Sequence, residues 1–507
     1  MVLPKIKAEP VKKDGQIIKF GGIRYGEGAT FGELEESRNL SSALLPVLTQ
    51  RKGRKTVAAY GSPTGLYARG KLCVVDGSSF IYDGITAGTV TPGEKQFAAI
   101  NTKIVIFPDK KYYDTDKGEF GDLEAAFTGA SVSFAANSIT KSGAGFDALF
   151  SAGDAIDISG CTARPENNKT VIARSVTAAV ITFSAGSLSA GTEASVTLKR
   201  SVPELTCICE SDNRIWGASG SVIYASSLGD PKNFYVYDGL STDSYSVAVG
   251  TDGEFTACIA YSNGVLFWKE NCVHKLLGNQ PSNYELYTYV LQGAKEGSEK
   301  SLVIINEVLY YHGRGGVFAF TGGAPELISE NFGARRYSGA VAGSDGERYY
   351  ISMKDEAGVW GLFVYDTLRG VWLREDDTRC DDFAYLSGGL YYLDHVTKKI
   401  MLAGQDDKEE GKLEWLASFA PFTEEIMGKK CYSKLLFRFE IEPEAWVQIY
   451  ISRDKGPFKK VYTALKHGGH TAYIKPERCD TFRVKLTGKG SVKIKQFARE
   501  FEIGSEV

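Results

Sequence analysis

The chain has 507 residues, is rich in Gly (56), Tyr (27) and Phe (27), and carries 59 Lys and Arg against 62 Asp and Glu, a net charge of −3. This balance excludes a globally positive surface of the kind that holds nucleic acid or acidic membranes. No apolar run approaches the roughly 18 residues of a membrane-spanning helix, and the N-terminal segment lacks a signal-peptide core, so we expect no stable membrane insertion and synthesis in a cytoplasm.

The chain begins with a segment that predicts an N-terminal arm. Residues 1–19 are polar and rich in lysine, and they include two prolines. The block that follows, FGGIRYGEGATFGELEESRNLSSALLPVLTQRKGRKT, predicts one short helix near residues 31–38 before the strands begin. Its basic end supplies three candidate cations for a DNA channel or an interface: Arg51, Lys52 and Arg54.

Two incomplete binding motifs come next. GLYARGKL, from Gly65 to Leu72, has the spacing of a phosphate-binding loop, but Leu72 replaces the Ser or Thr that binds Mg²⁺ and a strand follows instead of a helix. DTDKGEFGDLE, from Asp114, resembles a calcium loop, but its glycine is one place early and Ala125 stands where a bidentate Glu belongs. The nine cysteines form no CxxC pair and no regular spacing, which fits a reducing compartment. We therefore predict no metal and no cofactor.

A weak internal repeat organises most of the chain. Its unit is an apolar strand, a turn and a second strand rich in Tyr, Phe or Trp, as suits a β-rich composition with many glycine turns. The instances begin at Gly70, Phe97, Leu205, Phe255, Lys300, Gly346 and Asp381. From the third instance onward the spacing is about 35–50 residues, typical of a four-stranded propeller blade. We predict an all-β fold containing a β-propeller of six to eight blades, its first part in residues 20–123 and its second in residues 200–405.

Residues 124–199 interrupt the repeat. Their composition shifts to Ala, Ser, Thr and Gly, and the run FDALFSAGDAIDISGCTARPENNKTVIARSVTAAVITFSAG indicates about four short strands. We predict a small β-barrel or sandwich inserted in a blade connection, because the entropy cost of closing a loop rises slowly with its length.

The stretch RIWGASGSVIYASSLGDPKNF, from Arg214, is interpreted as one blade segment. A Trp-containing strand and a Tyr-containing strand flank a turn, and Gly-Asp-Pro then ends the pattern because proline fixes φ and glycine permits the turn. The predicted blade motif consists of Trp216, Tyr224, Gly229, Asp230, Pro231, Asn233 and Phe234. We expect Trp216 and Phe234 to pack between blades.

Catalytic patterns are missing from the sequence. Arg314, in YYHGRGGVFAF, stands on a glycine-flanked turn and is a further candidate cation for a DNA channel or an interface, since phosphate contacts need only exposed positive charge. The acidic pairs at 376–377 and 381–382 are interpreted as loop charges, because adjacent carboxylates on a strand point to opposite faces and cannot flank one glycosidic bond. No nucleophile elbow occurs. We predict no catalytic residue and no enzymatic activity.

The last segment, residues 406–507, predicts a separate domain. After a charged connector the polar and apolar residues alternate, so that Phe437 and Phe439 oppose Arg438 and Glu440. Its strands are separated by Asp-Lys-Gly and Gly-Lys-Gly turns, which favours an antiparallel β-sandwich.

Three of these segments resemble a known family. The opening block resembles the start of bacteriophage tail proteins, through Asn39, Leu40, Pro46, Arg51, Gly53 and Arg54. The Gly-Asp-Pro-x-Asn-Phe segment resembles a blade of the same proteins, and the insert is similar to small β-domains common in phage tails. The family is that of tail nozzle, or packaged-DNA stabilisation, proteins of short-tailed phages.

The resemblance implies a structural virion protein with no catalytic residue. Copies of the chain would form a homo-oligomeric ring, a hexamer, beside adjacent tail or adaptor proteins. The ring would retain packaged DNA and conduct it during ejection, with non-specific contacts to the DNA.

Two other functions stay open. A glycan-binding propeller or fibre-associated tail protein would contact the host cell surface through exposed aromatic side chains. A polysaccharide hydrolase would need two carboxylates about 5–10 Å apart in a cleft.

Overall fold

The computed structural model describes residues 11–26, 28–405 and 409–503. The fold is all-β, as the composition predicts: within the described residues the helices are α1 (Phe146–Leu149) and four single-turn 3-10 helices, and strands make up most of the rest. The 3-10 helices are η1 (Pro165–Asn167), η2 (Pro281–Asn283), η3 (Glu299–Ser301) and η4 (Glu330–Phe332). The chain divides into two compact units, of which unit 1 comprises the residues up to Tyr60 and those from Val303 onward, and unit 2 comprises Gly61–Leu302.

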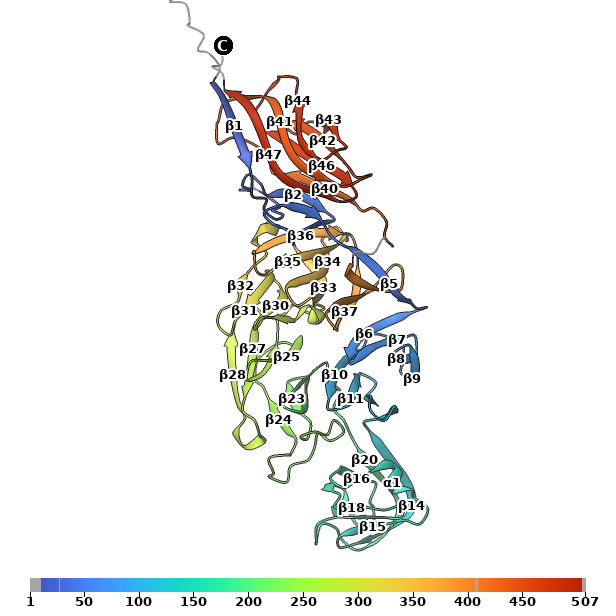
Figure 1. Ribbon diagram of the computed structural model, residues 1–507. Helices are drawn as coiled ribbons and strands as arrows, with labels where there is room; N and C mark the ends of the chain where they lie inside the picture. Colours follow the sequence, from blue (N-terminus) through green and yellow to red (C-terminus); the bar gives the residue numbers. More distant parts are fainter. Residues whose placement is uncertain (1–10, 27, 406–408, 504–507) are drawn as a thin grey trace, which may run out of the picture. The chain divides into compact units, whose positions relative to one another are not determined.

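Unit 2 contains four antiparallel sheets in which four consecutive strands pair in order (Figure 1). Short turns join most of the strands, whereas residues 226–244 form a long loop between β23 and β24 of sheet 3. Gly70 adopts the positive φ (68°) that the tight turn between β6 and β7 requires. Sheet 1 is β6 (Pro63–Arg69), β7 (Lys71–Asp76), β8 (Ser79–Tyr82) and β9 (Ile85–Thr89), and sheet 2 is β10 (Gln96–Ile100), β11 (Lys103–Phe107), β12 (Lys111–Asp114) and β13 (Glu119–Asp122). Sheet 3 is β21 (Cys207–Ser211), β22 (Arg214–Ser219), β23 (Val222–Ala225) and β24 (Tyr245–Ala248), and sheet 4 is β25 (Ala257–Tyr261), β26 (Gly264–Trp268), β27 (Cys272–Leu277) and β28 (Glu285–Val290).

Unit 1 contains three further sheets of four strands. Sheet 5 is β29 (Val303–Ile305), β30 (Val308–Gly313), β31 (Gly316–Phe320) and β32 (Glu326–Leu327), and sheet 6 is β33 (Tyr337–Ser344), β34 (Arg348–Asp355), β35 (Trp360–Asp366) and β36 (Val371–Asp376). Sheet 7 is β37 (Cys380–Leu386), β38 (Gly389–Asp394), β39 (Lys399–Gln405) and β5 (Gly53–Ala59). Its outer strand β5 therefore comes from near the start of the chain and pairs with β39.

Successive sheets pack with their first strands side by side. In unit 2, β10 lies beside β6 and β21, and β21 lies beside β25; in unit 1, β33 lies beside β29 and β37. Apolar clusters fill the spaces between neighbouring sheets, for example Ile104 and Phe80 between sheets 1 and 2. Each of the seven predicted repeats falls within one of these seven sheets.

The two incomplete binding motifs lie in hairpins of these sheets. Gly65–Leu72 forms most of the hairpin of β6 and β7, with no helix after it. Asp114 ends β12, and its carboxylate accepts hydrogen bonds from the backbone N–H groups of Asp116 (3.2 Å) and Lys117 (3.3 Å), as an ordinary turn aspartate does.

The structure gives the segment between β13 and β21 a sheet of its own. Its order is β17-β16-β20-β14-β15-β19-β18, and a separate apolar core that includes Phe146, Ile156 and Val196 packs against it. This sheet spans Ala125–Arg200, and the composition predicts the insert at residues 124–199. The strands are β14 (Ala125–Ala135), β15 (Ser138–Thr140), β16 (Ala155–Ser159), β17 (Thr170–Ile172), β18 (Ser175–Val176), β19 (Val180–Thr182) and β20 (Gly191–Arg200).

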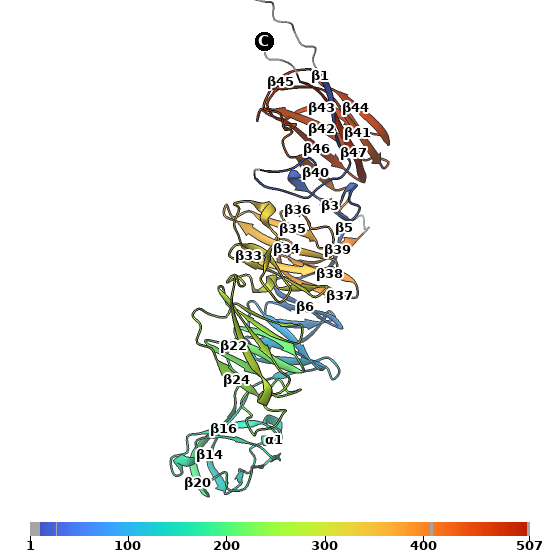
Figure 2. The same ribbon diagram turned by 90° about the vertical axis from the view of Figure 1, so that its left-hand side faces the viewer.

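The C-terminal residues form two sheets (Figure 2). Aromatic side chains of both sheets share one core. The ring of Tyr432 in one sheet stacks on that of Phe482 in the other at 4.0 Å between centroids. One sheet consists of β3 (Leu40–Ser41), β4 (Leu48–Gln50), β47 (Val492–Ile503), β41 (Lys430–Ile441), β44 (Gly468–Tyr473), β45 (Arg478–Cys479) and β1 (Val11–Ile17). The other consists of β2 (Leu34–Arg38), β40 (Glu414–Phe419), β46 (Phe482–Lys489), β42 (Trp446–Arg453) and β43 (Lys459–Ala464).

The N-terminal segment differs from its prediction in three ways. Residues 11–17 of the expected arm form β1, paired with β47, while residues 1–10 lie outside the described part. The expected helix near residues 31–38 is strand β2, paired with β40. Residues 34–50, assigned to the propeller, join the C-terminal sheets instead, because free edges of those sheets supply hydrogen-bonding partners that local sequence does not reveal.

In the described part of the chain, no helix combines the length and the hydropathy needed to cross a bilayer.

Candidate anion-binding site

The aromatic residues of the predicted blade motif lie between sheets. Trp216, on β22, is 2% exposed and packs edge-on against Tyr284 (5.2 Å between centroids) and against Phe267 of sheet 4. Phe234 is fully buried in a cluster with residues of sheets 2 and 3. Tyr224, on β23, is half-buried and packs edge-on against Tyr235. These side chains fill the space between sheets, as expected.

The rest of the motif ties the insert to sheet 3. Asn233 donates from Nδ2 to Asp154 (2.9 Å) and to Asp230 (2.7 Å), and its Oδ1 accepts the backbone N–H of Ala155 (3.0 Å). Asp154 in turn forms a buried ion pair with Arg200 at the end of the insert. Gly229 has φ of 72° and Pro231 follows at the turn, so the backbone presents Asn233 to the base of the insert.

A buried arginine fixes the loop that carries this motif. Arg214, fully buried, donates through its guanidinium to the carbonyl oxygens of Ser226 (2.8 Å), Ser241 (2.7 Å) and Asp243. Burial lowers the pKa of Arg214, and nearby Tyr284 and Asp243 oppose that shift. The guanidinium thus links the two ends of the loop 226–243.

Two of the predicted channel cations are buried and ion-paired. Arg54 is 4% exposed and donates to Glu375 (2.6 Å) and Asp376 (2.7 Å), and Arg51 is 6% exposed and donates to Asn39 (2.8 Å) and Glu410 (2.8 Å). Their guanidinium groups face carboxylates of this chain and are not available to phosphate. The expectation that Arg51 and Arg54 line a DNA channel is therefore corrected: they hold the N-terminal segment and β5 in unit 1.

The ion pairs of this cluster shift the pKa values of Asp376 and Arg54. Burial raises the pKa of Asp376, but Arg54, hydrogen bonds from Thr378, and Arg51 outweigh it and lower the pKa to about 2. Burial lowers the pKa of Arg54, but Tyr392, Asp376 and Glu375 raise it overall. Lys52, the third predicted cation, is exposed, and its carbonyl oxygen accepts a hydrogen bond from Arg51 (2.9 Å).

The acidic pairs have structural partners. Asp376 ends β36 in the arginine cluster, and Asp381, on β37, accepts hydrogen bonds from His395 (2.7 Å) and pairs with Arg379 (3.2 Å). Asp377 pairs with Arg374 and Arg38. Three of these four residues lie within strands, so their interpretation as loop charges is wrong for those three.

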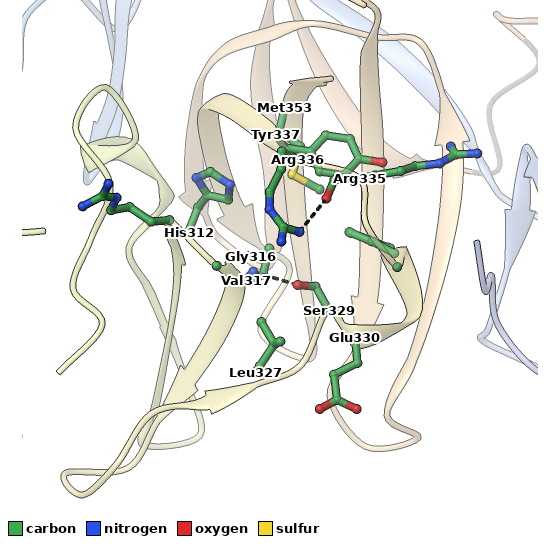
Figure 3. A pocket seen from close by; sticks show the side chains of 14 residues that line it. His312, Gly316, Val317, Leu327, Ser329, Glu330, Arg335, Arg336, Tyr337 and Met353 are labelled. Carbon is green, nitrogen blue, oxygen red and sulfur yellow. Dashed lines mark hydrogen bonds between the residues drawn. The ribbon is translucent and has the colours of Figure 1, made fainter. Parts of the chain in front are cut away.

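The fourth predicted cation, Arg314, lines a pocket of about 140 Å³ that we call the arginine pocket (Figure 3). The turn between β30 and β31 forms one wall, and the segment from Ser329 to Tyr337, which connects sheets 5 and 6, forms the other. Because antiparallel strands alternate in direction, this turn and the exit from β32 lie at the same end of sheet 5.

Three arginines line this pocket. Arg335 and Arg336 join Arg314, and all three are exposed. The guanidinium carbon of Arg335 lies 3.7 Å from the centroid of the Tyr25 ring, a cation–π contact. Figure 3 shows the side chain of Arg336 reaching down between His312 and Ser329, while that of Arg335 points away. Burial raises the pKa of Tyr25 to about 12, so this ring stays neutral beside the cation.

The equivalent turn of sheet 2, between β11 and β12, also carries a cation, because Lys110 lies there and forms an ion pair with Glu124 (3.0 Å). Among the described residues, no group of three or more His, Cys, Asp and Glu side chains is placed to hold a metal ion, and the nine cysteines are free thiols.

The sequence pointed to one residue of this pocket. Arg314 was distinguished by its glycine-flanked turn, but Arg335, Arg336 and Ser329 were missed. The available signal was the Arg-Arg doublet in NFGARRYSG, a charged pair in the connection between two strands.

No family model and no curated protein matches the chain. Among solved structures, it is similar to an exo-β-1,3-galactanase of Phanerochaete chrysosporium at 9% identity and a TM-score of 0.21, over 56% of this chain and 92% of that one. It is also similar to a bifunctional GH43-CE protein of Bacteroides eggerthii at 7% and 0.21, over 56% and 60%. An extracellular domain from B. thetaiotaomicron matches at 7% and 0.18, over 90% and 86%. At these TM-scores the similarities decide neither the fold class nor the function.

Proposed function

We propose that this chain is a seven-bladed β-propeller that serves as a non-catalytic structural protein of a bacteriophage tail, assembled as a ring that retains packaged DNA and conducts it during ejection. The proposal combines the arrangement of the seven sheets with the family resemblance of the opening block and the blade segment.

The order of the sheets along the chain is the main support for a propeller. In each unit the first strand of every sheet lies beside the first strand of the next, as the inner strands of a propeller do. The outer strand of each sheet leads to the first strand of the following sheet. β5, the outer strand of sheet 7, ends at Ala59 and leads through residues 60–62 to β6, the first strand of sheet 1. Sheet 7 is therefore connected to sheet 1 in the same way as each sheet is connected to the next. This connectivity is the one expected of a propeller.

The residues that carry the resemblance support a structural role. Asn39, Arg51 and Arg54 of the opening block form the buried cluster that holds the N-terminal segment against sheets 6 and 7. In the blade segment, Asn233 forms a hydrogen bond to Asp154 of the insert, and Phe234 packs between sheets 2 and 3. A protein under mechanical load from packaged DNA benefits from such buried cross-links between distant segments.

Oligomeric state tests this proposal. The purified chain should assemble into a ring with six times the 55.2 kDa mass of one copy, alone or with an adjacent tail protein. Mass photometry gives the copy number, and negative-stain images show whether a central hole is present. A monomer at every concentration, alone and with the tail proteins of its phage, would exclude the ring.

One observation favours a second function, glycan binding at the host surface. Tyr287 and Tyr289 lie on the same face of β28, the outer strand of sheet 4, and are 41% and 49% exposed. Exposed aromatic rings of this kind bind the apolar faces of sugars. Binding of the chain to host polysaccharide that is lost in Tyr287→Ala and Tyr289→Ala would support this function over the ring.

A further inference from the structure

The arginine pocket carries an excess of positive charge. Arg314, Arg335 and Arg336 line it together with one carboxylate, that of Glu330, which Figure 3 shows pointing away from Arg336. A hollow lined mainly by one sign of charge concentrates the field and attracts counter-ions of the opposite sign. The ligand that fits this charge is an anion.

The floor of the pocket provides a neutral hydrogen-bond donor. The hydroxyl oxygen of Ser329, a buried residue, accepts the backbone N–H of Val317 at 2.8 Å, which leaves the hydroxyl proton able to turn toward the pocket. Gly316 adjoins this hydroxyl, and a Cβ atom there would lie 2.3 Å from the Ser329 oxygen. Glycine at this position therefore keeps the hydroxyl accessible.

Arg336 is placed to act as the main charged donor. Its Nη1 atom donates to the carbonyl oxygen of Arg335 across 3.4 Å, a long bond at the limit of useful geometry. The planar guanidinium presents several N–H groups and forms paired hydrogen bonds to phosphate. A ligand oxygen in the pocket would replace one long bond by shorter, charge-assisted ones.

The size of the pocket limits the ligand. About 140 Å³ corresponds to the liquid volume of about five water molecules. This space holds a tetrahedral oxyanion but does not enclose a nucleoside. His312, buried at one wall, completes the lining on that side.

We propose that the arginine pocket is a phosphate-binding site, with Arg336 as the charged donor, the Ser329 hydroxyl as a neutral donor and Arg314 as a further positive charge in the lining. Arg335, stacked on Tyr25, places a positive charge at the side of the pocket. The phosphate group is the shared chemistry of two sources, a free phosphate and the backbone of a DNA strand. The proposed function favours the DNA backbone as the source, and only this choice of source rests on it.

A titration with inorganic phosphate tests the site itself. The full-length chain is titrated calorimetrically at constant ionic strength, beside Arg336→Gln, Arg314→Gln and the matched control Arg438→Gln, which removes an exposed arginine of β41. We expect saturable binding that weakens about 10-fold or more in Arg336→Gln, weakens less in Arg314→Gln and stays unchanged in the control. Melting in chloride shows that each variant is folded. Equal phosphate affinity in all four proteins would overturn the proposal.

A second arm identifies the source of the phosphate. A fluorescent oligothymidylate without a terminal phosphate should bind at low salt, inorganic phosphate should displace it, and Arg336→Gln should lower the salt slope of binding by about one. If only inorganic phosphate binds in the pocket, the DNA source is wrong and the site takes a free phosphate. Both readouts are independent of ring formation, so a monomer that binds phosphate through Arg336 would refute the ring and leave the site intact.

Discussion

At the scale of single residues, large aromatic side chains hold neighbouring sheets together. Trp216 of sheet 3 contacts Tyr284 and Phe267, and its indole N–H donates to the carbonyl oxygen of Ser211 at 3.2 Å. The residue is almost fully buried, so its stabilising effect comes from apolar area removed from water together with edge-to-face ring contacts.

Replacing Trp216 by Ala should lower the free energy of unfolding by about 3–5 kcal/mol, because the cavity cannot close between two sheets. Urea denaturation followed by far-UV circular dichroism measures the change. Tyr385→Ala serves as the control, because this ring is 53% exposed and its loss should cost less than about 1 kcal/mol. Equal losses in the two variants would place Trp216 outside the core.

At the scale of elements, strand β5 depends on ion pairs as well as on its ladder with β39. The strand presents Arg54 to Glu375 and Asp376, at the end of β36, so that one side chain links the outer strand of sheet 7 to sheet 6. Breaking such a pair on one side is costly, because the remaining charge stays buried without a partner.

This cluster makes stability depend on pH. The pKa of Asp376 is lowered to about 2 in the folded chain, from about 4 in the unfolded chain, so its contribution is complete above pH 4 and is lost as the pH falls toward 2. Two pKa units correspond to about 2–3 kcal/mol.

The difference in unfolding free energy between the natural chain and Asp376→Asn should therefore shrink by about 2 kcal/mol between pH 5 and pH 2.5. Urea titrations of both proteins at each pH measure it. Asp377→Asn, whose carboxylate is 57% exposed, is the matched control and should show little change. A difference that stays constant with pH would contradict the role assigned to Arg54.

At the scale of the whole molecule, the insert behaves structurally as a module. It has its own apolar core, and its first and last residues, Ala125 and Arg200, are register partners, so its two ends lie side by side. Such an insertion leaves the host fold intact, because the host strands only need their ends to stay close together.

Replacing residues 125–200 by a short Gly-Ser linker should leave a chain that folds cooperatively, destabilised by about 1–3 kcal/mol because Asn233 loses Asp154 and the N–H of Ala155. Thermal unfolding followed by tryptophan fluorescence measures this loss. Adding Asn233→Ser to the deletion should recover part of it. An aggregated or unfolded deletion chain would show that the insert is part of the host core.

The candidate site shows how far sequence reasoning extends at each scale. Arg314 was visible because glycines flank it on a turn, whereas the pocket depends on Arg335, Arg336 and Ser329 being brought beside that turn by the packing of sheets 5 and 6. Arg51 and Arg54 look in sequence like exposed cations. Their carboxylate partners stand more than 300 residues away, so their burial was not predictable from local charge.

The sequence by itself determined one strand–turn–strand unit in each of the seven sheets and the place of the insert, because alternating side chains, glycine turns and a shift in composition are local signals that depend on a few neighbouring residues. The tertiary structure decided where the N-terminal strands belong. β1 to β4 join the C-terminal sheets and β5 completes sheet 7. The ladder partners of β1, β2, β4 and β5 lie more than 300 residues further along the chain, and β3 is held through β4. Short strands carry little pattern of their own, and their positions follow from which distant sheet edge offers unpaired backbone hydrogen-bonding groups.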